Sequence, residues 1–139
     1  MNFTHKLAVS AFLFHEDRFL FLLRSTEPRV WAPPGGHLHV NESPEKGIIR
    51  ELKEETGLDV QVVAPLFTWF GYWKKNRVLS IDYYLKLVRG KIQLSNEHSD
   101  HKWVSLVELR AGNPIRLDPC LDLKVSDFEK AYELIKKLS

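Results

Sequence analysis

The chain has 139 residues, of which 44% are hydrophobic and 12% aromatic, and its formal net charge is +2. This length and composition predict one globular domain, residues 1–139, with a hydrophobic core of its own. A charge so close to zero excludes the strongly basic surface of a nucleic-acid coat protein or a membrane-surface protein, so we expect no clear nucleic-acid surface.

Cysteine usage and hydropathy indicate the compartment. The single cysteine, Cys120, cannot form an internal disulfide, so folding does not depend on an oxidising environment and we expect a cytoplasmic protein. The apolar run LAVSAFLF after Lys6 is too short to span a bilayer and has no small-residue cleavage site. We interpret this run as a buried strand and expect no membrane partner.

The first half of the chain predicts a hairpin, a loop and a helix. The runs KLAVSAFLF and FLFLLRS, separated by HEDR, are typical of two hairpin strands. The segment TEPRVWAPPGG is expected to form a loop. Ser43 is a good N-cap with Pro44 at the first helical position, and Gly57 suits a left-handed C-terminal cap. The sequence therefore predicts a helix over residues 44–56.

The second half predicts three strands and two helices. The segments DVQVVAPLFTWF and RVLSIDYYLKLV are rich in strand-forming residues and are joined by GYWKKN, and HKWVSL predicts one more strand. A capping box from Ser105 to Glu108 begins a short helix, and one from Ser126 to Glu129 begins the last helix. Strands and helices that do not alternate strictly favour an α/β sandwich around a mixed sheet.

The predicted helix 44–56 carries an edge of carboxylates. Glu51, Glu54 and Glu55 fall on one stripe, because residues three and four apart are neighbours on a helix surface. The stripe is either a solvated face or the wall of a cleft, where like charges about 6 Å apart repel by roughly 3 kcal/mol and need raised pKa values or bound cations. The bare backbone of Gly35 and Gly36 favours a cleft. The adjacent side is expected to pack on the sheet through Ile48, Ile49 and Leu52.

The segment from Gly36 to Leu58 resembles the signature box of the Nudix hydrolases, G-x5-E-x7-R-E-U-x-E-E-x-G-U, in which U is aliphatic. Nine constrained sites with two fixed gaps make this a specific signal. The resemblance implies a Nudix-type α/β/α sandwich around a mixed β-sheet and a pyrophosphohydrolase that acts on a nucleoside diphosphate linked to another group, X. The matching residues are Gly36, Glu42, Arg50, Glu51, Leu52, Glu54, Glu55, Gly57 and Leu58.

The resemblance also implies a metal site. Glu51, Glu54 and Glu55, with the carbonyl of Gly35, would hold Mg²⁺ or Mn²⁺, ions that prefer oxygen ligands. The ions would neutralise phosphate oxygens and lower the pKa of the attacking water. Glu51 and Glu97, in SNEHSDHKW, are alternative general bases. Glu97 is alternatively a further metal ligand or an exposed loop acid.

Two residues of the box are expected to have a structural role. The resemblance implies that Glu42 and Arg50 form a structural pair that keeps the loop in register with the helix, although Glu42 could also lie near the metals. Removing one member of a buried pair leaves an unpaired charge. Loss of activity after mutation of this pair would therefore be compatible with loss of shape.

Substrate contacts are expected outside the box helix. Arg24 ends the second strand, where relatives contact substrate phosphates, although a surface ion pair is the alternative. His37 and His39 follow the glycines and are candidates for substrate contact. Trp31, Trp69, Tyr72 and Trp73 are candidates for stacking on a nucleobase, with burial of a loop as the alternative, and of the four Trp31 and Tyr72 are the expected substrate contacts.

The substrate is inferred by elimination. Pro65 lies too close to the box for the proline of ADP-ribose-cleaving relatives, and Tyr72 is not clearly at the tyrosine position of dinucleoside polyphosphate relatives. A small nucleoside triphosphate, cleaved to a monophosphate and pyrophosphate, is the leading expectation. Dinucleoside polyphosphates, ADP-ribose, nucleotide sugars and a role as a non-catalytic nucleotide-binding module remain alternatives. Many relatives form dimers, so a homodimer also remains open.

Overall fold

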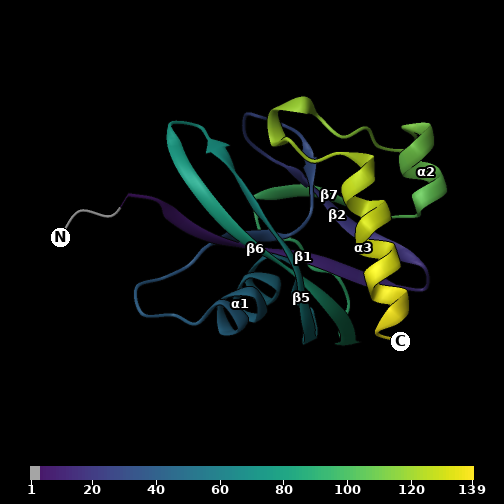
Figure 1. Ribbon diagram of the computed structural model, residues 1–139, viewed down its shortest axis with the longest axis horizontal. Coiled ribbons are helices and arrows are strands. Elements are labelled where there is room, and N and C mark those ends of the chain that lie inside the picture. Colours follow the sequence, from purple (N-terminus) through teal and green to yellow (C-terminus); the bar gives the residue numbers. More distant parts are fainter. Residues whose placement is uncertain (1–3) are drawn as a thin grey trace.

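The computed structural model describes residues 4–139. A seven-stranded sheet lies at its centre, with helices on both sides (Figure 1). None of the helices in residues 4–139 combines the length and the apolar character needed to cross a bilayer. The elements in chain order are β1 (Lys6–His15), β2 (Arg18–Arg24), β3 (Trp31–Ala32), β4 (Gly35–His37), α1 (Pro44–Thr56), β5 (Asp59–Trp73), β6 (Asn76–Arg89), β7 (His98–Val104), α2 (Leu106–Ala111), the 3₁₀ helix η1 (Pro119–Leu121) and α3 (Val125–Lys137).

The sheet is mixed, as predicted. Its strands pair in the order β3-β2-β1-β6-β5, while β4 pairs with β1 and β7 pairs with β2. β1 and β6 run parallel, and the other pairs are antiparallel. The β5–β6 hairpin turns at Lys74 and Lys75, inside the predicted turn GYWKKN, and the turn is shorter than predicted because β5 continues through Trp73 and β6 begins at Asn76. This extension lengthens the sheet face on which the candidate site is built.

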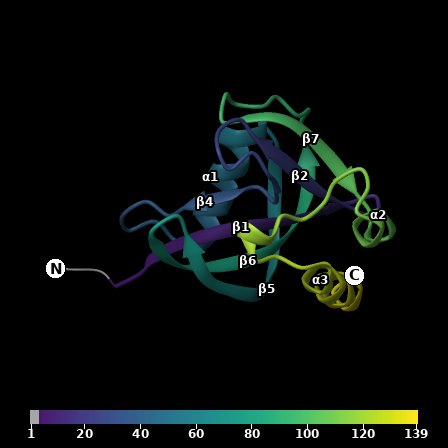
Figure 2. The ribbon, with the colours of Figure 1, turned by 90° about the horizontal axis from the view of Figure 1, so that it is seen from above.

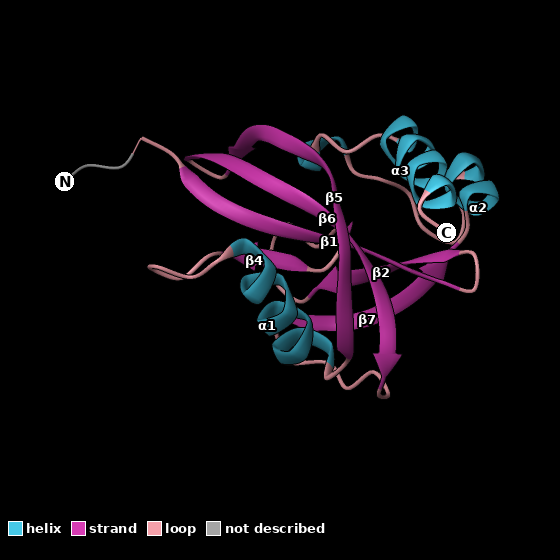
Figure 3. Ribbon diagram, turned by 60° about the horizontal axis from the view of Figure 1, so that its bottom comes forward, coloured by secondary structure: helices cyan, strands magenta, loops and turns pink. Residues whose placement is uncertain are grey.

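Helix α1 covers one face of the sheet, and α3 with α2 covers the other (Figures 2 and 3). Under α1, Ile48 and Leu52 are fully buried with Val9 of β1. On the opposite face Phe128 of α3 stacks on Phe12 of β1, with 4.8 Å between ring centres. The α/β sandwich is confirmed. Ile48, Ile49 and Leu52 were all expected to pack on the sheet, but Ile49 is 42% exposed. Ile48 and Leu52 are four residues apart and share one face of the helix, whereas Ile49 points away from that face.

The ends of the helices test the capping predictions. Helix α1 has its predicted limits: the Ser43 hydroxyl accepts from the Lys46 amide at 3.3 Å, and Gly57 has φ 74°. The Ser105 to Glu108 capping box of α2 is also confirmed. The capping box predicted at Ser126 is wrong, because α3 begins one residue earlier and the Asp127 carboxylate accepts from the Lys124 amide at 2.8 Å.

Two short strands occupy part of the segment predicted as a loop. Strand β4 pairs with β1, with Gly35 opposite Ser10 and Gly36 opposite Val9. A Cβ atom on Gly35 would lie 2.3 Å from the carbonyl oxygen of Val9, so the close approach of the two strands requires glycine. The pairing fixes both glycines against the sheet, directly before α1.

Candidate active site

A cavity of about 510 Å³ lies between α1, β4 and the sheet. The predicted box residues Gly35, Glu51, Glu54 and Glu55 all line it. The carboxylate edge of α1 is therefore the wall of a cleft rather than a solvated face.

Glu51 lies directly against Gly36. Its side chain is 13% exposed, and a Cβ atom on Gly36 would lie 2.5 Å from its Oε1 atom. Burial raises the pKa of Glu51, as do the nearby charges of Glu54 and Glu97, whereas Arg50 lowers it. Glycine at position 36 therefore leaves the space that this carboxylate occupies.

Glu55 is the most buried of the α1 glutamates that line the cavity, at 4% exposure. Its Oε1 atom accepts from the Gly35 amide at 3.0 Å, and its Oε2 atom lies 3.6 Å from Nε2 of His98. Burial raises the pKa of Glu55 to about 9, with the charge of Glu51 as the second cause. Burial also lowers the pKa of His98, so this imidazole does not supply a compensating charge. Without a cation in the cavity, Glu55 is protonated at neutral pH.

Arg50 forms the predicted pair with Glu42. Its Nε and Nη2 atoms donate to the two carboxylate oxygens at 2.7 and 2.9 Å, and Nη2 also donates to the His37 carbonyl. The bond from Arg50, followed by the bond from the His39 amide, lowers the pKa of Glu42 to about 2. The pair attaches the loop after β4 to α1.

The same guanidinium contacts two of the candidate metal ligands. Nη1 of Arg50 donates to Glu51 at 3.1 Å and to Glu54 at 3.2 Å. A cationic group therefore already lies against both carboxylates, in the place where a metal ion would offset their charge. Arg50 is both a clamp for the loop and a partner of the acidic edge.

Replacing Arg50 by Lys tests the clamp. Lysine keeps the charge but cannot give two parallel bonds to Glu42, so we expect a lower midpoint of thermal unfolding and a turnover reduced at least about 10-fold. Thermal unfolding and steady-state assays measure the two effects. Lys53→Met is the control, because its partner Asp59 lies on the surface and such pairs contribute little. An Arg50→Lys protein that matches the wild type in both assays would contradict the clamp.

The oxygen atoms of these carboxylates are suitable ligands for a divalent cation. Within residues 4–139 no three His, Cys, Asp or Glu side chains converge on one point. Two contacts account for this: Arg50 engages Glu51 and Glu54, while Glu55 is turned toward the Gly35 amide. All three nevertheless line one cavity with oxygen donors, which suit Mg²⁺ or Mn²⁺. The ligand role of the Gly35 carbonyl stays a prediction.

The structure also places the residues predicted to contact substrate. Arg24, His37, His39 and Glu97 line the cavity. The Arg24 guanidinium lies 5.0 Å from the ring centre of Trp73 and does not form the surface ion pair considered as its alternative. The Glu97 carbonyl accepts from the Ser25 amide at 2.9 Å, which holds the loop before β7 beside the end of β2.

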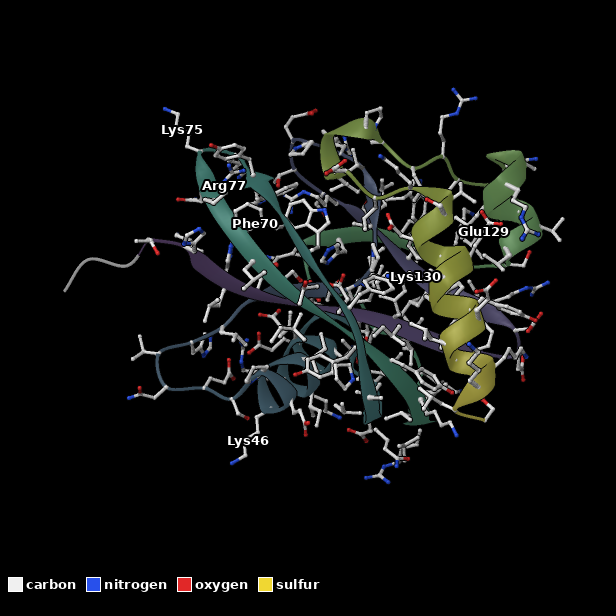
Figure 4. All side chains as sticks on the ribbon, in the orientation of Figure 1. Lys46, Phe70, Lys75, Arg77, Glu129 and Lys130 are labelled. Atoms are coloured by element: carbon white, nitrogen blue, oxygen red, sulfur yellow. The ribbon has the colours of Figure 1, made fainter. Side chains whose placement is uncertain are left out.

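Trp31 and Tyr72 do not line this cavity, and their stacking on a base stays a prediction. Tyr72 is 61% exposed and lies under the Arg77 guanidinium, 3.9 Å from its ring centre. Figure 4 shows Arg77 and Phe70 together on the β5–β6 hairpin. Trp31, on the short strand β3, packs at the edge of the α3-side core. Side chains alternate along a strand, so Tyr72 faces away from the side that Trp73 occupies.

Two of the four aromatic candidates for stacking, Trp69 and Trp73, line the cavity from one face of β5. Three further cavity residues were not predicted as site residues: Ser80 and Asp82 come from β6, and His98 begins β7. The signal for Ser80 and Asp82 is present in the sequence, because polar residues two apart inside an apolar strand face the same side.

The amino-acid sequence matches the NUDIX domain family model over residues 4–123, which is most of the chain. The chain belongs to the Nudix family. The resemblance drawn from the box is confirmed. The matched range of this Nudix chain contains α1 and every cavity-lining residue named above, and it ends just before α3.

Individual Nudix relatives differ in the substrate that their names state. A MutT-like protein of Streptomyces ambofaciens is 40% identical over 58 residues, 42% of this chain and 38% of the relative. The asymmetrical bis(5'-nucleosyl)-tetraphosphatase of Mus musculus is 29% identical over 96 residues, 65% of each chain. This Nudix chain therefore spans less than two thirds of the length of either relative.

The Nudix fold is shared with a solved UDP-X diphosphatase. The TM-score is 0.83 at 20% identity, over 100% of this chain and 66% of that chain. At this identity the likeness shows the fold alone. Nudix hydrolases generally use divalent metal ions, which agrees with the oxygen-rich wall formed by α1.

Proposed function

We propose that this chain is a Mg²⁺- or Mn²⁺-dependent pyrophosphohydrolase that acts on a nucleoside diphosphate linked to X. The observation that carries the proposal is the cavity wall of Glu51, Glu54 and Glu55, in which a buried carboxyl with a pKa near 9 lies beside a second one. Such an arrangement costs stability unless a cation enters. A diphosphate group binds divalent cations, so its binding would place in the cavity the positive charge that these carboxylates lack.

Different residues of the chain would have different roles in hydrolysis. Divalent ions bound by Glu51, Glu54 and Glu55 would supply charge neutralisation at phosphate oxygens and a water of lowered pKa. Glu51 or Glu97 takes the proton of the attacking water as its oxygen bonds to phosphorus and the anhydride P–O bond breaks. Arg24 offers a guanidinium for the phosphate oxygens of the departing group.

The leading substrate is a nucleoside triphosphate, cleaved to a monophosphate and pyrophosphate. The elimination of the other substrate classes from the sequence supports this choice. The similarity to the mouse asymmetrical tetraphosphatase favours a dinucleoside polyphosphate as a second candidate. ADP-ribose and nucleotide sugars contain the same diphosphate. A non-catalytic module is disfavoured, because all of the box glutamates are present.

A substrate panel tests the proposal. The full chain is incubated with Mg²⁺ or Mn²⁺ and nucleoside triphosphates, a dinucleoside tetraphosphate, ADP-ribose and a nucleotide sugar, and the products are separated by anion exchange. We expect monophosphate and pyrophosphate from a triphosphate, and no turnover after addition of a chelator. Nucleotide binding without cleavage of any phosphoanhydride would contradict the enzyme and support a binding module.

A further inference from the structure

Asp82 is a buried acid with an oxygen atom that has no partner. It lies in the middle of β6 and is 2% exposed. Its Oδ1 atom accepts from the Ser80 hydroxyl at 2.9 Å, whereas its Oδ2 atom is buried and makes no hydrogen bond within residues 4–139. Burial raises the pKa of Asp82 to about 7, with a smaller contribution from the charge of Asp127. A buried polar atom without a partner costs stability and calls for an explanation.

The carboxyl belongs to the floor of the cavity. Asp82 and Ser80 both line it, and they share one face of β6 because they are two residues apart. Ser10 of β1 lies opposite Asp82 in the parallel ladder and also lines the cavity. Tyr84, two residues after Asp82 and on the same face of β6, packs in the α3-side core, so this part of the cavity lies on the face of the sheet opposite α1.

Aromatic and aliphatic side chains enclose the same end of the cavity. Trp69 of β5 pairs with Ser80 and lines the cavity with Trp73. The indole N–H of Trp69 donates to the Asp122 carbonyl at 3.3 Å, which ties β5 to the segment that supplies Leu121 and Leu123. Flat apolar walls above a single carboxyl suit a planar ring that carries polar atoms on one edge.

Asp82 has no charged partner. None of the ion pairs found within residues 4–139 includes it, and Arg24, a cation that also lines the cavity, is placed over Trp73. The Ser80 hydroxyl donates to Oδ1, so the ionised carboxylate presents its free Oδ2 atom to the cavity as an acceptor. The complementary ligand edge therefore carries N–H groups.

We propose that Asp82 is a specificity-determining residue that accepts N–H groups from the base of the substrate, so that the cavity selects a base with two adjacent donors. Guanine has such an edge, with a ring N–H beside an amino group. Hypoxanthine lacks the amino group, and adenine places an acceptor beside its amino group. Uracil and thymine flank their single N–H with carbonyl oxygens, which a carboxylate repels. The inference rests on the proposed function only in taking the ligand to be a nucleotide.

The test is a binding measurement that does not need turnover. Guanosine, inosine and adenosine monophosphates are titrated into the full chain by calorimetry, with quenching of tryptophan fluorescence as a second readout. We expect the guanosine nucleotide to bind at least about 10-fold more tightly than the inosine nucleotide, because a buried acceptor rejects an analogue that lacks its donor. Equal affinities in the wild-type chain would overturn the proposal.

Asp82→Asn supplies the matched variant. It preserves shape but replaces one acceptor with an amide donor, so the guanosine preference should fall to within about 2-fold of unity. Asp100→Asn is the control, since Asp100 is exposed on β7 and does not line the cavity. Unchanged preference in Asp82→Asn, with a normal unfolding transition, would also overturn the proposal.

The two proposals fail separately. Metal-dependent hydrolysis without any preference among the three bases would leave the enzyme in place and remove the role of Asp82. Selective binding of the guanosine nucleotide without hydrolysis of any triphosphate would support the role of Asp82 and contradict the proposed enzymatic activity. If Asp82→Asn does not fold, the affinity ratio of the wild-type chain still decides the question.

Discussion

Glu55→Gln is expected to abolish most turnover and, in the metal-free chain at pH 8, to raise the free energy of unfolding. Burial raises the pKa of Glu55 in the folded state to about 9, from its ordinary value of 4.5. Between those two pH values the unfolded chain releases a proton that the folded chain retains, so stability falls as pH rises through this window. One pKa unit corresponds to about 1.4 kcal/mol, and the gain on neutralising Glu55 should be at least about 1 kcal/mol.

The local contacts of Glu55 allow this substitution. The carbonyl of a glutamine can still accept from the Gly35 amide, which Glu55 now does at 3.0 Å. The loss of the negative charge removes a metal ligand, and we expect turnover to fall about 100-fold or more, since even residues that only support metal ligands contribute 10- to 100-fold. Higher stability with lower activity would identify Glu55 as a functional acid that destabilises the metal-free fold.

Thermal unfolding at pH 5 and pH 8 with a chelator, and again with Mg²⁺, measures these effects. We expect the advantage of Glu55→Gln to shrink at pH 5, because this pH lies near the lower end of the window between the two pKa values, where little of the destabilisation has developed. Mg²⁺ should raise the unfolding midpoint of the wild type more than that of the variant, because a ligand stabilises the state that binds it.

Two neighbouring acids serve as controls for Glu55→Gln. Glu54→Gln should lose turnover with little change in stability, since its side chain is 58% exposed. Glu45→Gln should change neither property, because Glu45 is exposed and does not line the cavity. A Glu55→Gln protein that unfolds at a lower temperature than the wild type in chelator at pH 8 would contradict the account.

Local sequence was enough to predict the box helix. The limits of α1 follow from Ser43 and Gly57, and the pairing of Arg50 with Glu42 follows from the box resemblance. Capping depends on side chains and backbone groups only a few residues apart, so both ends can be read without a structure. The burial of Glu55 could not be read in this way, because it depends on β4 and on His98 of β7, which reach α1 through the sheet.

The floor of the cavity depends on strand register, which is a property of the whole sheet. Asp82 lies opposite Ser10 because β1 and β6 are parallel and pair from Lys6 with Val78 onward. The positions of Lys6 and Val78 in the chain do not reveal that pairing. Tyr72 and Trp73 are consecutive in β5, so alternation allows only one of them to face the cavity, and the sequence does not show which one does.

Gly36→Ala is expected to lower turnover by about 10- to 100-fold while leaving the fold intact. The new methyl group would lie 2.5 Å from Oε1 and 2.6 Å from Cδ of Glu51, so the carboxylate must move. The end of a flexible side chain moves at small cost in stability. The Glu51 carboxylate would then leave the position in which Arg50 contacts it at 3.1 Å, and a misplacement on this scale can strongly reduce catalysis.

Gly35→Ala is the matched comparison, and we expect it to lower the stability of the fold rather than to displace a side chain of the site. Its methyl group would lie 2.3 Å from the Val9 carbonyl oxygen and 3.0 Å from Cα of Ser10, which are backbone atoms of β1. The β1–β4 pairing must open to admit it, and we expect a loss of roughly 1–3 kcal/mol in the free energy of unfolding. Denaturant unfolding together with Mg²⁺-dependent turnover separates the two variants.

The pair of alanine variants distinguishes the position of one carboxylate from the integrity of the strand beside it. If Gly36→Ala unfolds like the wild type and is nearly inactive, activity depends on where the Glu51 carboxylate lies, since the substitution adds a single methyl group and removes no charge. If Gly36→Ala is fully active, Glu51 is neither the general base nor an essential metal ligand, and Glu97 becomes the remaining candidate for the base. Both outcomes can be read without knowing the natural nucleotide, because any cleaved triphosphate of the panel reports them.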